Sequence, residues 1–211
     1  VGVNSGSLRD RRTNIDISKE MVKSALGFIR ILEGMDFYNI IVSLKASTVT
    51  ETVSAYRMMS GKCRYPFHLG VTATGYNQEA VVKSSIGIGG LLLEGIGDII
   101  RVSLTDTVVK EVIVAKEILR SLGLRNNGMD LISCPTCGRC QVNVIKIVKQ
   151  LKNKLITHYS SLVAQPLKVA VMGCEVNGPG EAKEADLGVA CGKGTAMLFK
   201  RGHILRRVRE K

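Results

Sequence analysis

Short apolar runs alternate with longer stretches of helical periodicity over the first 124 residues. Four of the runs predict strands, at Val1–Val3, Ile40–Leu44, His68–Thr72 and Ile99–Leu104. They recur roughly every 30 residues, which is the length of a strand–helix unit. This alternation predicts parallel strands joined by right-handed helical crossovers. Four such units would form a small open sheet or half of an eight-stranded barrel.

Two of the intervening helices carry clear boundary signals. Thr48 and Glu51 have the spacing of a capping box, and the apolar residues that follow recur on one helix face. A second helical pattern runs from Val109 to Leu122, and Gly123 is placed to cap it. Because the first predicted strand begins at Val1, we expect a fragment whose N-terminal strands are missing.

The pattern changes after Gly123, where a polar turn over residues 125–128 is typical of a linker. Beyond it the sequence predicts a strand, an apolar-striped helix, a buried strand, and one or two strands at the end; these span Met129–Ser133, Val142–Leu155, Leu167–Met172 and Leu187–Leu205. We therefore predict a barrel-type domain over residues 1–124 and a small α/β domain over residues 125–211.

Cysteines dominate the chemistry of the second domain. Cys134, Cys137 and Cys140 have C-x2-C-x2-C spacing, and Cys174 follows in a loop rich in Gly and Pro. This arrangement is typical of iron–sulfur clusters, and a tetrahedral zinc site is the competing interpretation. The spacing does not fit a disulfide framework, so a reducing, cytosolic setting is expected.

Other groups near these thiols are less informative. Glu181 is either a solvated loop charge or a weak, displaceable ligand for one iron. Cys63 is expected to be a packed residue, and Cys191 is placed in a glycine turn, where a ligand role is disfavoured. His158 and His203 are expected at the surface because no metal-ligand spacing relates the histidines.

The net charge of +12 suggests an anionic partner, and the absence of tryptophan argues against base-stacking surfaces. We find no signal-peptide pattern, and the longest apolar run, Ile86–Leu93, is too short to cross a bilayer. Residues at the expected carboxyl ends of the strands could bind anionic oxygens; they are Asn4, Lys45, Thr72, Arg101 and Ser103. The alternative is that Lys45 and Arg101 are solvated rim charges.

Two segments carry a specific resemblance. Ser133–Arg139 and Met172–Ala182 closely resemble the 4-hydroxy-3-methylbut-2-en-1-yl diphosphate synthases of the non-mevalonate isoprenoid pathway. Similar segments extend the resemblance over nearly the whole chain, at residues 1–7, 45–47, 68–72, 83–89 and 94–105. The fold implied is a TIM-type (β/α)8 barrel, of which this chain has the C-terminal half, followed by a cluster domain.

The resemblance also implies a site. The family binds a [4Fe–4S] cluster, and the matching ligands in this chain would be Cys134, Cys137, Cys174 and Glu181. Cys140 would then be surplus or an alternative ligand. The substrate would be 2-C-methyl-D-erythritol 2,4-cyclodiphosphate, reduced with two electrons from a ferredoxin or flavodoxin. Its diphosphate would contact the five anion-binding candidates. The resemblance further implies a cytoplasmic homodimer, with the barrel of one subunit facing the cluster domain of the other.

One position departs from that family. Its members usually have a Glu, thought to be a catalytic acid, where this chain has Ala73, and Glu79 is the nearest acid that follows. Two rival functions remain at this stage. One is a zinc-stabilised nucleic-acid-binding module, favoured by the charge, and the other is an iron–sulfur electron carrier without a substrate. We expect neither nucleic acid nor a membrane as partner.

Overall fold

The computed structural model describes residues 1–8, 16–72, 74–126, 128–158 and 166–209. The chain divides into two compact units, Val1–Arg125 and Asn126–Lys211. Within the described residues, no helix is long and apolar enough to cross a membrane.

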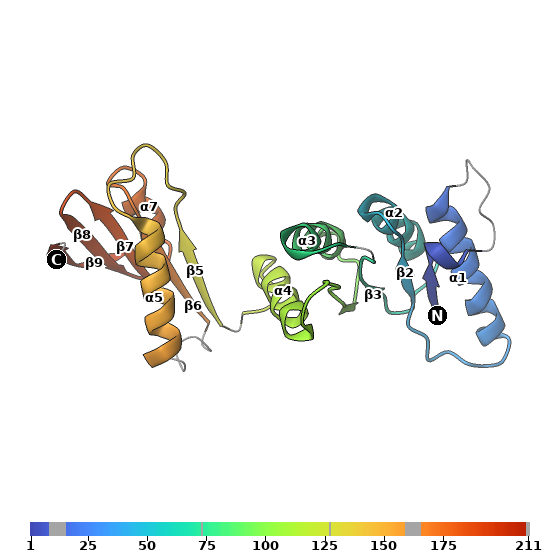
Figure 1. Ribbon diagram of the computed structural model, residues 1–211. Helices are drawn as coiled ribbons and strands as arrows, with labels where there is room; N and C mark the ends of the chain where they lie inside the picture. The colour runs from blue at the N-terminus through green and yellow to red at the C-terminus, as the bar shows by residue number, and fades with distance from the viewer. Residues whose placement is uncertain (9–15, 73, 127, 159–165, 210–211) are drawn as a thin grey trace. The chain divides into compact units, whose positions relative to one another are not determined.

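The first unit alternates strands and helices, as the sequence predicts (Figure 1). Its elements are β1 (Gly2–Asn4), the 3-10 turn η1 (Ser5–Ser7), α1 (Ile17–Glu33), β2 (Ser43–Lys45), α2 (Val49–Ser60), β3 (His68–Leu69), α3 (Asn77–Leu93), β4 (Ile99–Ile100) and α4 (Val108–Ser121). β1 pairs with β2 and β3 pairs with β4, both in parallel, and a parallel bridge from Val42 to Phe67 joins the two ladders. The described part of the unit is an open row of four parallel strands, and no closed barrel is found in it.

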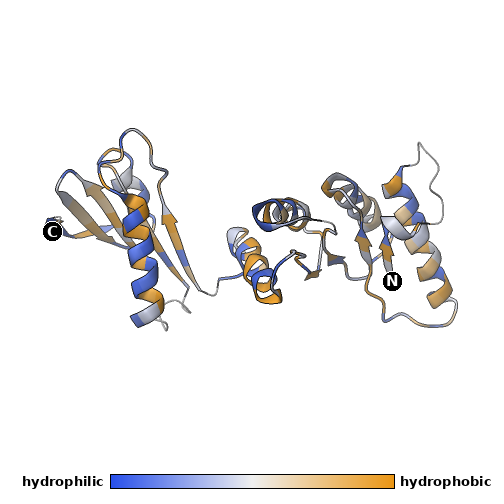
Figure 2. Ribbon diagram, viewed as in Figure 1, coloured by the Kyte–Doolittle hydropathy of each residue, from blue (hydrophilic) through white to orange (hydrophobic). Residues whose placement is uncertain are grey.

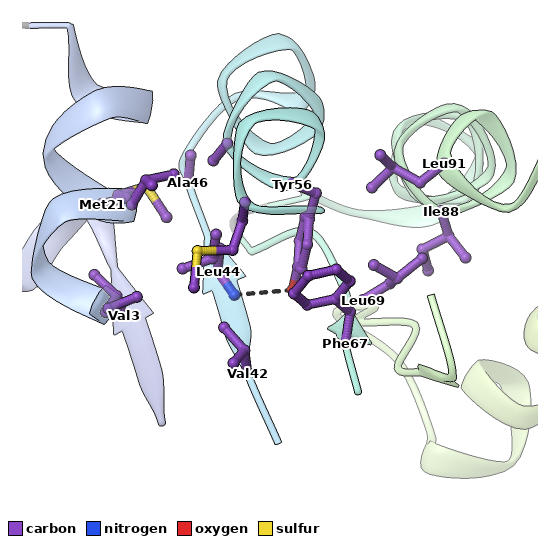
Figure 3. Packing of buried hydrophobic residues seen from close by; sticks show 14 of the residues in the cluster. Val3, Met21, Val42, Leu44, Ala46, Tyr56, Phe67, Leu69, Ile88 and Leu91 are labelled. Carbon is purple, nitrogen blue, oxygen red and sulfur yellow. Dashed lines mark hydrogen bonds between the residues drawn. The ribbon is translucent and has the colours of Figure 1, made fainter. Parts of the chain in front are cut away.

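The core of this unit lies between the strands and helices α1, α2 and α3, and Figure 3 shows its packing. Helix α2 begins where the sequence predicts, because the Thr48 hydroxyl accepts the Glu51 N–H at 3.2 Å. The helix directs Tyr56 into the core, where its ring and that of Phe67 make an edge-to-face contact with their centroids 5.7 Å apart. The Tyr56 hydroxyl accepts the Leu44 N–H at 2.8 Å and donates to the His68 carbonyl. Tyr56 therefore links β2 to β3.

The apolar stripe of α4 is helical but largely uncovered. Val109, Val112 and Ile113 are at least half exposed, and Ile118 is the buried residue of the helix. The helix packs mainly against α3, which leaves its other side open to solvent. Its C-terminal end is as predicted, because Gly123 has φ +70 and the Leu124 N–H reaches the Leu119 carbonyl at 2.9 Å.

The second unit is one mixed sheet with two helices in its described part (Figure 1). Its elements are β5 (Met129–Ser133), α5 (Val144–His158), β6 (Leu167–Met172), α7 (Gly178–Lys183), β7 (Leu187–Gly192), β8 (Thr195–Lys200) and β9 (His203–Arg209). The strands follow chain order, with β5, β6 and β7 parallel and β7, β8 and β9 antiparallel. Bands of apolar and polar residues alternate along α5, as Figure 2 shows. Short helix α7 lies against β6 and β7, and Gly188 allows the contact because a Cβ there would be 2.3 Å from the Ala182 carbonyl oxygen.

The C-terminal segment differs from the sequence prediction of one or two strands, because it forms three. Gly194 (φ +69) closes the first hairpin, and Arg201 (φ 45) with Gly202 (φ 84) closes the second. Positive φ at both Arg201 and Gly202 matches the twist of a two-residue hairpin, and the two hairpins reverse the chain twice within this segment. The placement of Cys191 in a glycine turn is also wrong, since this residue is buried within β7.

Candidate functional site

A row of four residues crosses the strands of the first unit at their carboxyl ends. Asn4 of β1 pairs with Lys45 of β2. A Cβ placed on Gly70, just after β3, would lie 3.7 Å from Lys45 Cε, 3.8 Å from Arg101 Cβ and 2.9 Å from the Arg101 carbonyl oxygen. Gly70 therefore lies between Lys45 and Arg101. Because it has no side chain, the two cationic residues can approach each other across it.

The electrostatics of this row favour an anion. The pKa of the half-buried Lys45 amine is lowered, first by burial and then by the nearby positive charge of Arg101. None of the salt bridges formed among the described residues involves Lys45 or Arg101. Two adjacent cations without a carboxylate partner repel each other, and a phosphate between them would relieve that repulsion.

The remaining anion-binding candidates lie at the same ends of the strands but are partly engaged. The Thr72 hydroxyl donates to the Ala46 carbonyl at 3.0 Å. The Asn4 side-chain oxygen accepts the Gly6 N–H at 2.9 Å and caps η1. Ser103 is half-buried, and its carbonyl accepts the Thr74 hydroxyl. The structure thus brings Lys45 and Arg101 together, while Thr72 and Asn4 already bond to the backbone.

His68 also lies near Lys45 and Arg101, although it is not among the anion-binding residues that the sequence predicts. Its Nδ1 lies 3.2 Å from the hydroxyl of Ser43, which is two residues before Lys45 on β2. Burial lowers the pKa of the imidazole, and the positive charges of Lys45 and Arg101 lower it further. The available signal was strand alternation, because His68 is two residues before Gly70 and shares its face of the sheet.

Two positions bear on the catalytic acid, Ala73 and Glu79. Ala73 lies outside the described residues. Glu79, the candidate substitute, is in the first turn of α3 and pairs with Lys83 at 2.8 Å. The hydrogen bond and charge of Lys83 lower the pKa of this carboxyl, so Glu79 is held ionised. A carboxylate in this state is poorly suited to donate a proton.

In the second unit the two cysteine-rich loops leave neighbouring parallel strands at the same edge. Ser133 of β5 pairs with Val171 of β6, so Cys134 and Gly173 are the residues that follow at the ends of their strands. The Gly173 N–H donates to the Cys134 sulfur at 3.1 Å. N–H···S bonds of this kind stabilise thiolates and tune the potentials of iron–sulfur clusters.

Cys174 is buried, and its environment favours the thiolate. The backbone N–H groups of Asn177, Gly178 and Val176 point to its sulfur and lower the pKa of the thiol. Glu181 is exposed in the first turn of α7, rather than in an open loop, and Cys137 is exposed. Three thiols and a carboxylate at one sheet edge are donors of the type that iron–sulfur clusters use.

These donors do not converge in the structure. Over the ranges described, no three His, Cys, Asp or Glu side chains are grouped in a way that could hold a metal ion. Cys140 approaches Gly173 instead, and its thiol donates to the Val142 carbonyl at 3.1 Å. Cys63 is half-buried in the other unit, and burial raises the pKa of its thiol. His158 and His203 are exposed, as predicted.

The first unit has a cationic edge at the ends of its parallel strands, and the second has two thiol-bearing loops at one edge of its sheet. This combination is typical of an α/β metalloprotein with an anionic ligand. Residues 1–116 match the family model described as the GcpE TIM-barrel domain, and residues 130–211 match the GcpE protein C-terminal domain. The chain belongs to the GcpE family.

Curated relatives support the same assignment over the whole chain. The chain is 58% identical over 213 residues to a protein of Thermodesulfovibrio yellowstonii named 4-hydroxy-3-methylbut-2-en-1-yl diphosphate synthase (flavodoxin), covering 100% of the chain and 60% of the relative. Proteins of the same name from Lawsonia intracellularis and Clostridium perfringens are 49% and 48% identical, covering 99% and 100% of the chain and 57% and 60% of those proteins. The chain therefore spans about three fifths of the length of these relatives.

Proposed function

We propose that the chain is the diphosphate-binding and cluster-binding part of a 4-hydroxy-3-methylbut-2-en-1-yl diphosphate synthase. The reaction would be the two-electron reductive ring opening and dehydroxylation of 2-C-methyl-D-erythritol 2,4-cyclodiphosphate. The observation that carries this proposal is the meeting of the two thiol loops at the ends of β5 and β6, where Gly173 donates to Cys134. The printed names of the relatives support it.

The first unit would bind the diphosphate as part of a (β/α)8 barrel. Arg101 presents a planar guanidinium that can form two parallel bonds to phosphate oxygens, and Lys45 adds a point charge beside it. Burial and the charge of Arg101 both lower the pKa of Lys45, and an arriving anion would oppose both effects by stabilising the charged amine. Ser103, Thr72, Asn4 and His68 would orient the substrate from neighbouring strands.

The second unit would hold a [4Fe–4S] cluster through Cys134, Cys137, Cys174 and Glu181. Such a cluster supplies electrons one at a time and offers an iron as a Lewis acid. The chain's own contribution is to prepare the ligands: three backbone N–H groups stabilise the Cys174 thiolate, and Gly173 orients the Cys134 sulfur. Glu181 is exposed and so could give way to a substrate oxygen.

Electron delivery would come from an acidic carrier such as flavodoxin, the donor in the relatives' names, or a ferredoxin. Helix α5 carries four exposed lysines and no acidic residue; the lysines are Lys146, Lys149, Lys152 and Lys154. The helix begins at Val144, whose side chain lies beside Gly173, so this basic face starts at the thiol loops. Complementary charge would guide an acidic carrier to that face. The proposal includes a cytoplasmic location and a homodimer. Light scattering on the purified protein tests the dimer.

Anaerobic reconstitution tests the cluster. We expect about four irons and four sulfides per chain. Cys134→Ala, Cys137→Ala and Cys174→Ala should each abolish the signal, because each removes a thiolate ligand. Cys63→Ala is the matched control, since this thiol lies in the other unit. Stoichiometric zinc in place of iron, or a cluster that survives Cys174→Ala but not Cys140→Ala, would refute the ligand set.

A further inference from the structure

Two thiols of the second unit converge on one glycine. A Cβ on Gly173 would lie 2.5 Å from the Cys140 sulfur and 3.6 Å from the Cys134 sulfur. The backbone N–H and carbonyl of Gly173 also bond to the loop that carries these two thiols. Its N–H donates to the Cys134 sulfur at 3.1 Å, and its carbonyl accepts the Gln141 N–H at 2.8 Å.

The backbone of the first thiol loop explains why residues six apart arrive at the same place. The Cys137 N–H bonds to the Pro135 carbonyl at 2.8 Å, and the Cys140 N–H bonds to the Cys137 carbonyl at 3.0 Å. These two turns fold the loop back toward the strand from which it left. The loop-closure entropy of joining Cys134 to Cys140 has therefore largely been lost already in the folded chain.

The two sulfurs also have complementary surroundings. Cys134 accepts a hydrogen bond from Gly173, while Cys140 donates one to the Val142 carbonyl. Both side chains are half-buried and neither is in a disulfide. Rotating either side chain about its Cα–Cβ bond moves the sulfur by about 3 Å. Because Gly173 has no side chain, both sulfurs can lie beside this residue.

We propose that Cys134 and Cys140 are a dithiol site that a small-molecule disulfide, such as oxidised glutathione, converts to a Cys134–Cys140 disulfide in the cluster-free chain. One thiolate attacks the small disulfide, forming a mixed disulfide and releasing one glutathione thiolate. The second protein thiolate then attacks the protein sulfur of the mixed disulfide and releases the second glutathione. The protein loses two electrons, oxidised glutathione gains them, and the two thiol protons pass to the released glutathione thiolates.

The disulfide would hold Cys134 in an oxidised form from which reduction regenerates the free thiol. A free thiol that oxidises past the sulfenic acid is lost irreversibly, whereas a disulfide is recovered by thiol exchange. The bond itself rests on the thiol geometry alone, and only its consequence for cluster uptake rests on the proposed function. In the oxidised chain Cys134 cannot ligate a metal, so reduction would have to precede cluster assembly.

Tryptic mapping can test the bond directly. The cluster-free chain is incubated with oxidised glutathione, free thiols are alkylated, and the chain is digested with trypsin. Cleavage after Arg139 separates residues 126–139, which contain Cys134 and Cys137, from residues 140–146, which contain Cys140. We expect these two peptides to be joined, and to separate after treatment with dithiothreitol.

Variants identify the partner. Cys140→Ser and Cys134→Ser should each abolish the joined peptides, while Cys137→Ser and the control Cys63→Ser should retain them. An internal bond within residues 126–139 with Cys140 alkylated would overturn the proposal, as would joined peptides that survive Cys134→Ser. Iron uptake is measured on the same protein after reduction. A bond without later cluster assembly refutes the proposed function alone, and a cluster without the bond refutes this inference alone.

Discussion

Replacing Tyr56 by Phe removes a hydroxyl that joins the two strands leading to Lys45 and Gly70. The side chain is fully buried on α2, and its hydroxyl accepts the Leu44 N–H (Figure 3). The same hydroxyl donates to the His68 carbonyl. The phenylalanine ring would keep the apolar contacts, including the edge contact with Phe67. The change therefore isolates the hydrogen bonds from the packing.

The two partners of the hydroxyl are not affected equally. The His68 carbonyl also accepts the Ser43 hydroxyl at 3.1 Å, so it remains bonded in the variant. The N–H of Leu44, a fully buried residue, loses the partner that the structure gives it. Leaving a buried donor unsatisfied costs about 1–3 kcal/mol, which we take as the expected loss of unfolding free energy. For a domain of this size, each kcal/mol corresponds to roughly 2–8 °C in melting temperature.

Urea unfolding followed by tyrosine fluorescence, together with hydrogen exchange at Leu44, measures this loss. Exchange of the Leu44 amide should accelerate by about 5- to 150-fold, because the expected loss is about 1–3 kcal/mol and ~1.4 kcal/mol corresponds to a factor of ten. Burial raises the pKa of Tyr56 to about 12, so the hydroxyl is neutral in the wild-type chain and the difference should be constant from about pH 6 to about pH 9.

Tyr65→Phe is the matched control. The Tyr65 hydroxyl donates to the Glu33 carboxylate at 2.8 Å near the surface. Removing this hydroxyl therefore leaves no buried polar group without a hydrogen-bond partner. We expect the control to unfold at nearly the wild-type urea concentration. Equal stability and equal Leu44 exchange in wild type and Tyr56→Phe would show that the hydroxyl does not join β2 to β3, and the reasoning would fail.

Three further predictions concern the proposed site. Arg101→Ala should weaken binding of inorganic pyrophosphate roughly 10- to 100-fold by calorimetry, and Lys45→Arg should weaken it less, because the charge is kept; equal affinities would place both residues outside the site. Because folding lowers the pKa of His68, the unfolded chain binds more protons between that lowered pKa and the ordinary value of 6.5, so stability should rise with pH through that window. His68→Gln should flatten this part of the profile, and an unchanged slope would contradict the assignment. Reversing Lys149 and Lys152 to Glu should reduce the rate of electron transfer from flavodoxin at low salt and leave the iron content unchanged, whereas reversing one lysine of α1 should not affect transfer.

The sequence by itself determined the features that depend on neighbours along the chain. Thr48 and Gly123 marked a helix start and a helix end, because capping involves residues only a few positions apart. The bounds of β5 and β6 agree with the predicted runs, since apolar residues predominate in each of these short segments. The spacing of the cysteines predicted a metal site in the two loops, which the sheet brings to the same edge.

Only the tertiary structure decided which distant residues meet. Gly70 lies between Lys45 and Arg101 because of the register of three strands, and hydrophobic alternation gives the face of a residue but not its partner across the sheet. Alternation places His68 on the face of Gly70, but the sequence does not show that Lys45 and Arg101 lie near it. Likewise, C-x2-C-x2-C spacing treats its three thiols alike, whereas the fold places Cys134 and Cys140 against Gly173 and leaves Cys137 exposed. The two turns within the loop are local, but Gly173, which follows β6, comes from a distant segment, and no local pattern encodes its contact with the two thiols.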